Sequence, residues 1–210
     1  MQRRYIMKLY LASKSYSRSL LLKNARIPFD VIGQDADELQ CDWELPLEQL
    51  VLSIADHKME HAVLPHGQEG DTILVLTGDT LTQDMRGVVY GKAADYNDAI
   101  KTIKALQNGS LVSTGFRLDK KIKRKGTWET VGSHREVVSA RCVFNIPDYW
   151  IERYLQQEPL ALKAAGAMVI EEYGQQFLQS VTGSYSTIMG LPVCEVRVAL
   201  EKLGFFQFLQ

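Results

Sequence analysis

The stretch LYLASKSYSRSLLL, residues 9–22, indicates the first structural elements of the fold. An apolar run up to Ala12 gives way to hydroxyl and basic side chains, and the apolar pattern resumes at Leu20. This order predicts a buried strand, a short loop and a helix. Because the first turn of a helix leaves backbone N–H groups unpaired at its positive end, the loop is also a candidate anion site.

Side chains around the start of this helix could add hydrogen-bond donors for a phosphate chain: Ser13, Lys14, Ser15 and Arg18. The alternative is a helix that a serine simply caps after a buried strand, and the stretch alone does not separate the two. A P-loop is excluded, because no glycine precedes the helix and Gly-Lys-Ser/Thr does not occur.

The composition is that of an ordinary globular protein. Of its 210 residues, 46% are hydrophobic and 23% are charged, and the formal net charge is −1. This charge predicts no global attraction to nucleic acid or to an anionic membrane. Any anion site must therefore be local.

The sequence predicts a cytoplasmic protein without a structural zinc. Cys41, Cys142 and Cys194 are odd in number and lack metal-ligand spacing, so we interpret them as reduced thiols. The apolar run near the N-terminus is about seven residues long and has no small-residue cleavage site, which argues against a signal peptide. No stretch approaches the roughly 18 apolar residues of a membrane span.

Two neighbouring segments carry candidate charges. The apolar residues of 47–64 form one helical stripe, and Lys58 lies close to it. This lysine either snorkels to solvent or points across a cleft at phosphate. The preceding loop contains Asp35, Asp37 and Glu38, which form either a solvated turn or a site for a divalent cation.

A third candidate charge follows a predicted strand. Residues 72–77, TILVLT, are typical of a strand buried on both faces, and we expect it to end at Gly78. Asp79 would then lie at the rim where open α/β sheets bind ligands, although aspartate at a strand end is also a common turn former. A small excursion or a hairpin is expected over residues 81–89.

The rest of the chain predicts further helices and strands. Helices are expected over 95–107, 147–157 and 193–203, and strands over 111–118 and 136–146, with 127–132 pairing between them. The basic residues of 120–125 are interpreted as a charged hairpin tip and not as a nucleic-acid site, because no aromatic platform is interleaved.

Taken together, the order of these motifs over about residues 7–203 resembles the Maf family of nucleoside triphosphate pyrophosphatases. The residues that carry the resemblance are Ser13 with the loop around it, the acidic loop at 35–38, Lys58, Gly78-Asp79-Thr80, Gly91-Lys92, Thr114-Gly115, Ala165-Gly166-Ala167 and residues 186–192, STIMGLP.

The resemblance implies a single α/β domain over residues 1–210, with an elongated mixed β-sheet flanked by helices and two lobes around a central nucleotide cleft. It also implies a cytoplasmic enzyme, often a homodimer, that uses a divalent metal (Mg or Mn) and needs neither nucleic acid nor membrane as a partner. The implied reaction hydrolyses a nucleoside triphosphate between its α and β phosphates, which yields the monophosphate and pyrophosphate.

The resemblance also implies residue roles. Asp79 is the implied catalytic carboxylate, and Asp37 and Asp79 are the implied metal ligands. Substrate binding is assigned to Ser13, Ser15, Arg18, Lys58, Lys92 and Glu171.

Two departures from the family pattern bear on activity and on base preference. Ser17 stands where the family usually has arginine, so one cation fewer is available for phosphate, and a non-catalytic relative that binds a nucleotide or a partner remains an alternative. Glu171 stands where glutamine is usual. A carboxylate suits the two N–H donors of guanine, whereas an amide suits uracil or thymine. The branch of the family that prefers 7-methyl-GTP resembles this sequence in having glutamate at this place and no arginine at position 17, so the resemblance implies 7-methyl-GTP as substrate, with a dTTP/UTP-type activity or a solvent-facing Glu171 as alternatives.

Overall fold

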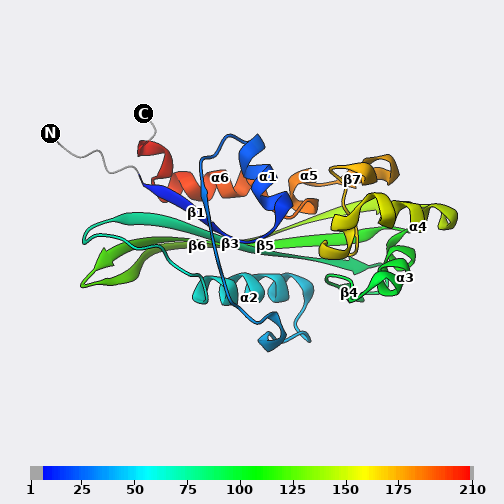
Figure 1. The fold of residues 1–210 in the computed structure, drawn as a ribbon, viewed down its shortest axis with the longest axis horizontal. Coiled ribbons are helices and arrows are strands. Elements are labelled where there is room, and N and C mark those ends of the chain that lie inside the picture. Colours follow the sequence, from blue (N-terminus) through cyan, green and yellow to red (C-terminus); the bar gives the residue numbers. More distant parts are fainter. Residues whose placement is uncertain (1–6, 209–210) are drawn as a thin grey trace. The chain divides into compact units, whose positions relative to one another are not determined.

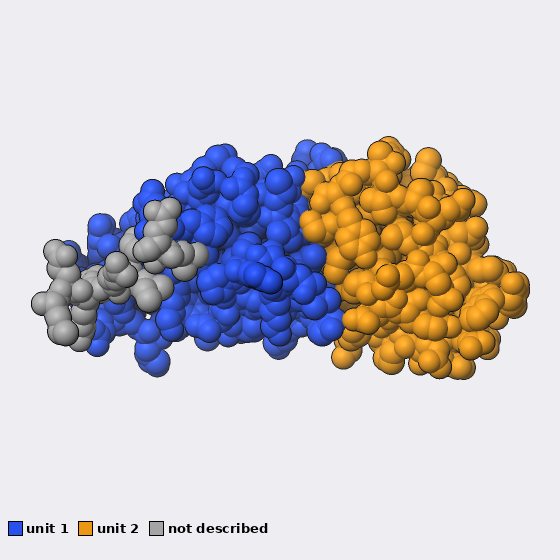
Figure 2. Space-filling view, turned by 90° about the horizontal axis from the view of Figure 1, so that it is seen from above, with its two compact units in different colours: residues 1–79, 115–137, 191–210 blue, residues 80–114, 138–190 orange. Residues whose placement is uncertain are grey.

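The computed structural model describes residues 7–208 and contains a seven-stranded mixed sheet flanked by helices (Figure 1). The strand order is β2-β1-β3-β5-β6-β7, and β4 pairs with β3. The chain divides into two compact units (Figure 2). Unit 1 comprises the chain up to Asp79, residues 115–137 and the chain from Leu191 onward; unit 2 comprises residues 80–114 and 138–190. The mixed sheet with flanking helices confirms the predicted fold class.

The strands are β1 (Lys8–Ala12), β2 (Asp30–Ile32), β3 (Thr72–Asp84), β4 (Val89–Tyr90), β5 (Ser110–Arg124), β6 (Thr127–Phe144) and β7 (Leu178–Thr182). The α-helices are α1 (Tyr16–Asn24), α2 (Leu47–Glu60), α3 (Tyr96–Leu106), α4 (Asp148–Gln157), α5 (Tyr185–Ile188) and α6 (Val193–Lys202). The short 3-10 helices are η1 (Glu38–Gln40), η2 (Pro159–Lys163), η3 (Tyr173–Phe177) and η4 (Phe205–Phe208). Among the described residues, no helix is long and apolar enough to cross a membrane.

Unit 1 begins with the predicted strand, loop and helix. The strand β1 lies between β2 and β3 and is parallel to both, with Leu11 opposite Leu76 in β3. The helix α1 begins after Ser15, whose hydroxyl accepts a hydrogen bond from the backbone N–H of Arg18 at 3.3 Å. This serine cap satisfies one of the N–H groups that the first helical turn leaves unpaired.

In unit 1, α2 covers one face of the sheet, and α1 and α6 cover the other (Figure 1). The close approach of α2 depends on Gly115 in β5, because a Cβ there would lie 2.8 Å from backbone atoms of Val51 and Leu52. The helix ends at Glu60, one turn earlier than the predicted 47–64. Lys58 is buried on the sheet side, at 5% exposure, which confirms its predicted place beside the buried stripe.

The prediction that the third strand ends at Gly78 is wrong, because β3 continues as a single strand to Asp84. A Cβ on Gly78 would lie 3.1 Å from the carbonyl oxygen of Gly115, so this glycine permits close contact with the neighbouring strand. Farther on, Thr82 pairs with Tyr90 of β4 in an antiparallel hairpin. Pairing with neighbours thus satisfies the backbone where the sequence suggested a turn, and Asp79 lies within a strand.

The segments predicted at 111–118, 127–132 and 136–146 form parts of two long strands, β5 and β6. Lys125 and Gly126 join them with φ values of 48° and 78°, which is the geometry of a tight two-residue hairpin turn. The basic run beside this turn is not uniformly solvated. Lys121 is buried against Asp119 at 3.1 Å, and Lys123 lies 5.2 Å above the ring of Trp128.

Unit 2 has its own hydrophobic core, to which α3, α4 and the segment from η2 to η3 contribute. The side chain of Asp95 caps α3 by accepting a hydrogen bond from the N–H of Asp98 at 2.8 Å. At the centre of this core, the hydroxyl of Tyr154 donates to the carbonyl of Ala167 at 3.1 Å and accepts from the N–H of Val169 at 2.9 Å. This pair of bonds holds the loop in which Ala167 has a φ of 53°.

Candidate active site

Three side chains of unit 1, two of them buried, form a cluster of ion pairs. Lys58 Nζ lies 2.6 Å from Asp79 Oδ1 and 2.8 Å from Glu38 Oε1. The side chains of Lys58 and Asp79 are 6% and 9% exposed, and that of Glu38 is 31% exposed. One ammonium group therefore bridges two carboxylates, in surroundings where charge interactions are stronger than in water.

Three elements supply these groups. Asp79 projects from β3 toward α2, Lys58 lies in the last turn of α2, and Glu38 opens η1. The apolar stripe of α2, which includes Leu50, Ile54 and Ala55, requires this face of the helix to pack on the sheet. The same packing brings the Lys58 ammonium group next to the Asp79 carboxylate.

Ser13 and Arg18 lie together at the end of β1. The Ser13 hydroxyl accepts from Arg18 Nη1 at 3.2 Å and from the N–H of Ser15 at 3.2 Å. Arg18 is 8% exposed. Burial lowers the pKa of its guanidinium, and the negative charges of Asp79 and Glu38 oppose that shift. The start of α1 thus carries a hydroxyl and a buried cation, and the cation interacts electrostatically with Asp79 and Glu38; this combination is suited to binding an anion.

From the acidic loop it is Glu38 that reaches the site, whereas the resemblance implies Asp37 as the metal ligand. The Asp37 side chain is turned to the start of η1, where it accepts from the N–H of Leu39 at 3.1 Å and from Gln40 Nε2 at 3.4 Å. Its neighbour Glu38 reaches Lys58 instead. Spacing within the loop could not separate the two residues, because the direction of the 3-10 turn decides which one faces Lys58. A metal-binding role for Asp37 stays a prediction.

The site offers two carboxylates for a divalent cation, on Asp79 and Glu38. Among the described residues, no group of three or more His, Cys, Asp or Glu side chains is arranged to hold a metal ion. Mg²⁺ is commonly bound through one or two carboxylates together with substrate phosphates. The donor set therefore fits a cation that arrives with a phosphorylated substrate.

The predicted residues Lys92 and Glu171 belong to unit 2. Lys92 forms an isolated bridge with Ala165, and the N–H of Gly166 donates to the carbonyl of Gly91 at 2.9 Å. The Gly-Lys and Ala-Gly-Ala motifs are therefore neighbours in the fold. The Glu171 carboxylate accepts from the N–H of Ile170 at 3.1 Å. Substrate binding by Lys92 and Glu171 stays a prediction.

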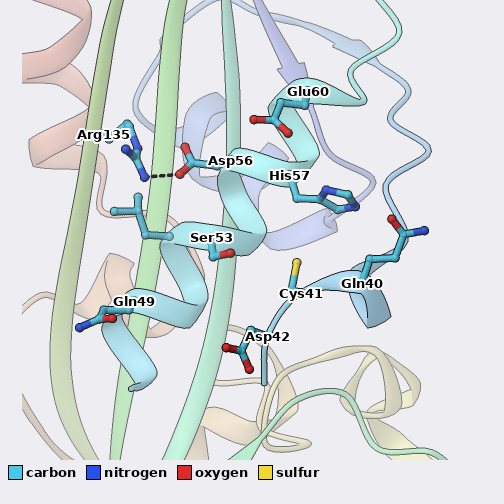
Figure 3. Close-up of a pocket in the computed structure, with 10 residues that line it drawn as sticks. Gln40, Cys41, Asp42, Gln49, Ser53, Asp56, His57, Glu60 and Arg135 are labelled. Carbon is cyan, nitrogen blue, oxygen red and sulfur yellow. Dashed lines mark hydrogen bonds and ion pairs between the residues drawn. The ribbon is translucent and has the colours of Figure 1, made fainter. Parts of the chain in front are cut away.

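A cavity of about 450 Å³ lies beside α2 in unit 1 (Figure 3). Its walls come from the segment after η1, from α2 and from Arg135 of β6, and the lining residues in the described chain include none of the predicted site residues. Cys41 lines this cavity. Burial raises the pKa of its thiol, and the charges of Asp79 and Glu38 raise it further, so Cys41 stays a neutral thiol at neutral pH.

Comparison with known proteins identifies the family. The family model described as Maf-like protein matches residues 8–203. The chain belongs to the Maf family. A dTTP/UTP pyrophosphatase of Syntrophus aciditrophicus is 33% identical to this Maf protein, over 96% of this chain and 92% of the relative. A dTTP/UTP pyrophosphatase of Dechloromonas aromatica is also 33% identical, over 95% and 98% of the two chains. A nucleoside triphosphate pyrophosphatase of Roseobacter denitrificans is 30% identical, over 93% and 96%.

Proposed function

We propose that this Maf protein hydrolyses a nucleoside triphosphate between its α and β phosphates, releasing a nucleoside monophosphate and pyrophosphate. The observation that carries the proposal is the buried contact of Lys58 with Asp79 and Glu38, with Arg18 and Ser13 at the adjacent start of α1. Phosphoryl transfer needs mainly positioning and charge stabilisation, for which fixed cations around a carboxylate are suited. The names of the relatives support the same reaction.

In this mechanism Ser13, Arg18 and Lys58 bind phosphate oxygens, and Asp79 orients the attacking water and takes its proton. The water oxygen bonds to the α-phosphorus, the bond from that phosphorus to the bridging oxygen breaks, and pyrophosphate leaves. Lys92 is assigned to the phosphates as a second lysine.

The proposed mechanism includes a divalent cation bound beside the phosphates. Asp79 and Glu38 are its proposed ligands, with Asp37 as the further acidic group that the sequence suggested. When bound, Mg²⁺ or Mn²⁺ supplies additional neutralisation of the phosphate charge.

Two base preferences have support. The relatives named dTTP/UTP pyrophosphatase favour a thymine or uracil nucleotide. Glu171, in contrast, favours a guanine nucleotide, because a carboxylate accepts from the N–H donors of a guanine edge, and the resemblance to one branch of the family points within that class to 7-methyl-GTP. The names of these relatives make the pyrimidine substrate at least as well supported as 7-methyl-GTP.

A substrate panel tests the proposal. We expect pyrophosphate and monophosphate in equal amounts from dTTP and UTP or from 7-methyl-GTP, in the presence of Mg²⁺ or Mn²⁺, with one class preferred at least about 10-fold, as a few well-placed base contacts allow. Glu171→Gln should leave pyrimidine turnover intact and lower turnover of 7-methyl-GTP. Release of orthophosphate would contradict the proposed bond cleavage. Absence of turnover with every substrate would favour the non-catalytic alternative.

Lys58→Gln tests the assignment of phosphate binding. We expect affinity for a triphosphate to fall about 10- to 100-fold, the equivalent of one charge-assisted hydrogen bond, and affinity for the matching nucleoside to stay unchanged. Calorimetric titration measures both. The matched control is Lys104→Gln, because Lys104 forms a half-exposed ion pair with Asp148 on α3 and α4. Equal losses for triphosphate and nucleoside would assign Lys58 to the fold instead.

A further inference from the structure

A buried hydroxyl joins the strand of Asp79 to the helix of Lys58. Thr77 is fully buried in β3, and its Oγ1 donates to the carbonyl oxygen of Ala55 in α2 at 2.8 Å. Residues two apart in a strand point to the same face, so Thr77 and Asp79 both face α2. Residues three apart in a helix lie on the same side, as Ala55 and Lys58 do. Strand and helix therefore meet at two adjacent points, the hydroxyl bond and the ion pair.

The hydrogen bond from Thr77 to Ala55 is suited to hold α2 in place on the sheet. The acceptor is a backbone carbonyl, so the bond holds the helix itself and not a side-chain rotamer. Thr77 is β-branched and has few side-chain conformations, which makes the link short and stiff. A buried hydroxyl without a partner is costly, so any sliding of α2 that broke the bond would carry a penalty.

The other contacts of α2 restrain it differently. Gly115 allows α2 to lie close to the sheet, but an absent side chain does not stop the helix from sliding along it. Asp56 of α2 forms ion pairs with Arg117, at 3.4 Å, and with Arg135. Figure 3 shows the pair with Arg135. The Arg135 side chain is 51% exposed, and long exposed side chains restrain a helix weakly.

We propose that Thr77 is a positioning residue, which fixes α2 on β3 so that Lys58 Nζ meets Asp79 Oδ1 at 2.6 Å. Its kinetic consequence rests on the proposed function, whereas its geometric consequence does not. Thr77 acts on the reaction through α2 and through the ion pair.

The kinetic test compares Thr77→Val, Thr77→Ser and Ile73→Val. Valine keeps the branched shape of the threonine side chain and removes its hydroxyl, whereas serine keeps the hydroxyl and removes the methyl group. Because a misplacement of about 1 Å can cost on the order of 100-fold in rate, we expect kcat to fall about 10- to 100-fold in Thr77→Val and to stay within about 3-fold of wild type in Thr77→Ser. Ile73→Val shortens a buried side chain of the same strand, and it should lower the melting temperature without lowering kcat.

A second test does not depend on activity. Melting temperatures are measured for Thr77→Val, Asp79→Asn and the double variant, and the two single shifts should not add, because both variants alter one strand-to-helix contact. The shifts of Ile73→Val and Asp79→Asn should add. Additive shifts for Thr77→Val, or an unchanged kcat in an active protein, would overturn the positioning role. If the wild type hydrolyses no triphosphate, the proposed function fails and the melting experiment still decides the role of Thr77.

Discussion

Asp79→Asn is expected to lower pyrophosphate release by about 10³-fold or more while nucleotide affinity changes only a few-fold. Asparagine has the shape of aspartate, so the contacts of β3 with α2 stay sterically possible. Its amide carries no charge and cannot take a proton from water. Steady-state kinetics with the preferred triphosphate and calorimetric titration with the same nucleotide separate the two effects.

Asp84→Asn is the matched control for this variant. Asp84 is also buried in β3, but its carboxylate accepts from the backbone N–H groups of Arg86 and Val88 at the β3–β4 turn. We expect Asp84→Asn to lower the melting temperature and to leave kcat unchanged. Comparable turnover in Asp79→Asn and wild type would mean that the catalytic carboxylate has been misassigned.

Asp119→Asn is expected to lower the free energy of unfolding by about 3 to 5 kcal/mol, the usual cost of breaking a buried ion pair from one side. Asp119 is fully buried in unit 1. Its carboxylate accepts two bonds of 3.0 Å from Arg117 and further bonds from Lys121 at 3.1 Å and Ser133 at 2.7 Å. The variant removes the carboxylate that pairs with the buried Lys121 and one of the two carboxylates that pair with Arg117. Urea unfolding at pH 7 measures the loss, and an exposed acid, as in Asp148→Asn, serves as control.

The same carboxylate predicts a dependence of stability on pH. Burial raises the pKa of Asp119, but hydrogen bonds from Arg117 and Ser133 and the charge of Lys121 outweigh it, so the pKa in the fold lies below the ordinary value. A lowered pKa stabilises the fold above the unfolded pKa of about 3.9, and this contribution is lost as pH falls below it. Unfolding free energy should therefore decline more steeply below about pH 4 in wild type than in Asp119→Asn. Equal slopes would contradict this role.

Local signals explain which parts of the fold could be predicted. Ser15 and Asp95 cap their helices because a short polar side chain can reach the free N–H groups of the first turn. The place of Lys58 close to the buried stripe of its helix follows from helical periodicity, whereas its burial depends on its partners Asp79 and Glu38. The caps and the helical stripe depend on residues within one or two helical turns of one another.

Long-range pairing explains what the sequence did not reveal. Gly78 and Asp79 have the composition of a turn, yet β3 continues through them because neighbouring strands satisfy its backbone. Likewise, a run of basic residues suggested a solvated tip, but Lys121 is buried because Asp119 faces it. Asp119 lies in the same strand, but Thr130 and Ser133 of β6 complete this cluster, and no local pattern records which residues of β6 face β5.

The sequence by itself determined the first strand, loop and helix, the helices near 95–107, 147–157 and 193–203, the place of Lys58 beside its buried stripe and the resemblance to the Maf family, because each depends on local spacing or on the order of motifs. Only the tertiary structure decided that Glu38 and not Asp37 meets Lys58, that Asp79 lies inside a strand, and that Thr77 joins that strand to α2. The physical reason is that a hydrogen bond or an ion pair forms between atoms within about 3 Å, and which atoms come that close is set by the packing of whole elements.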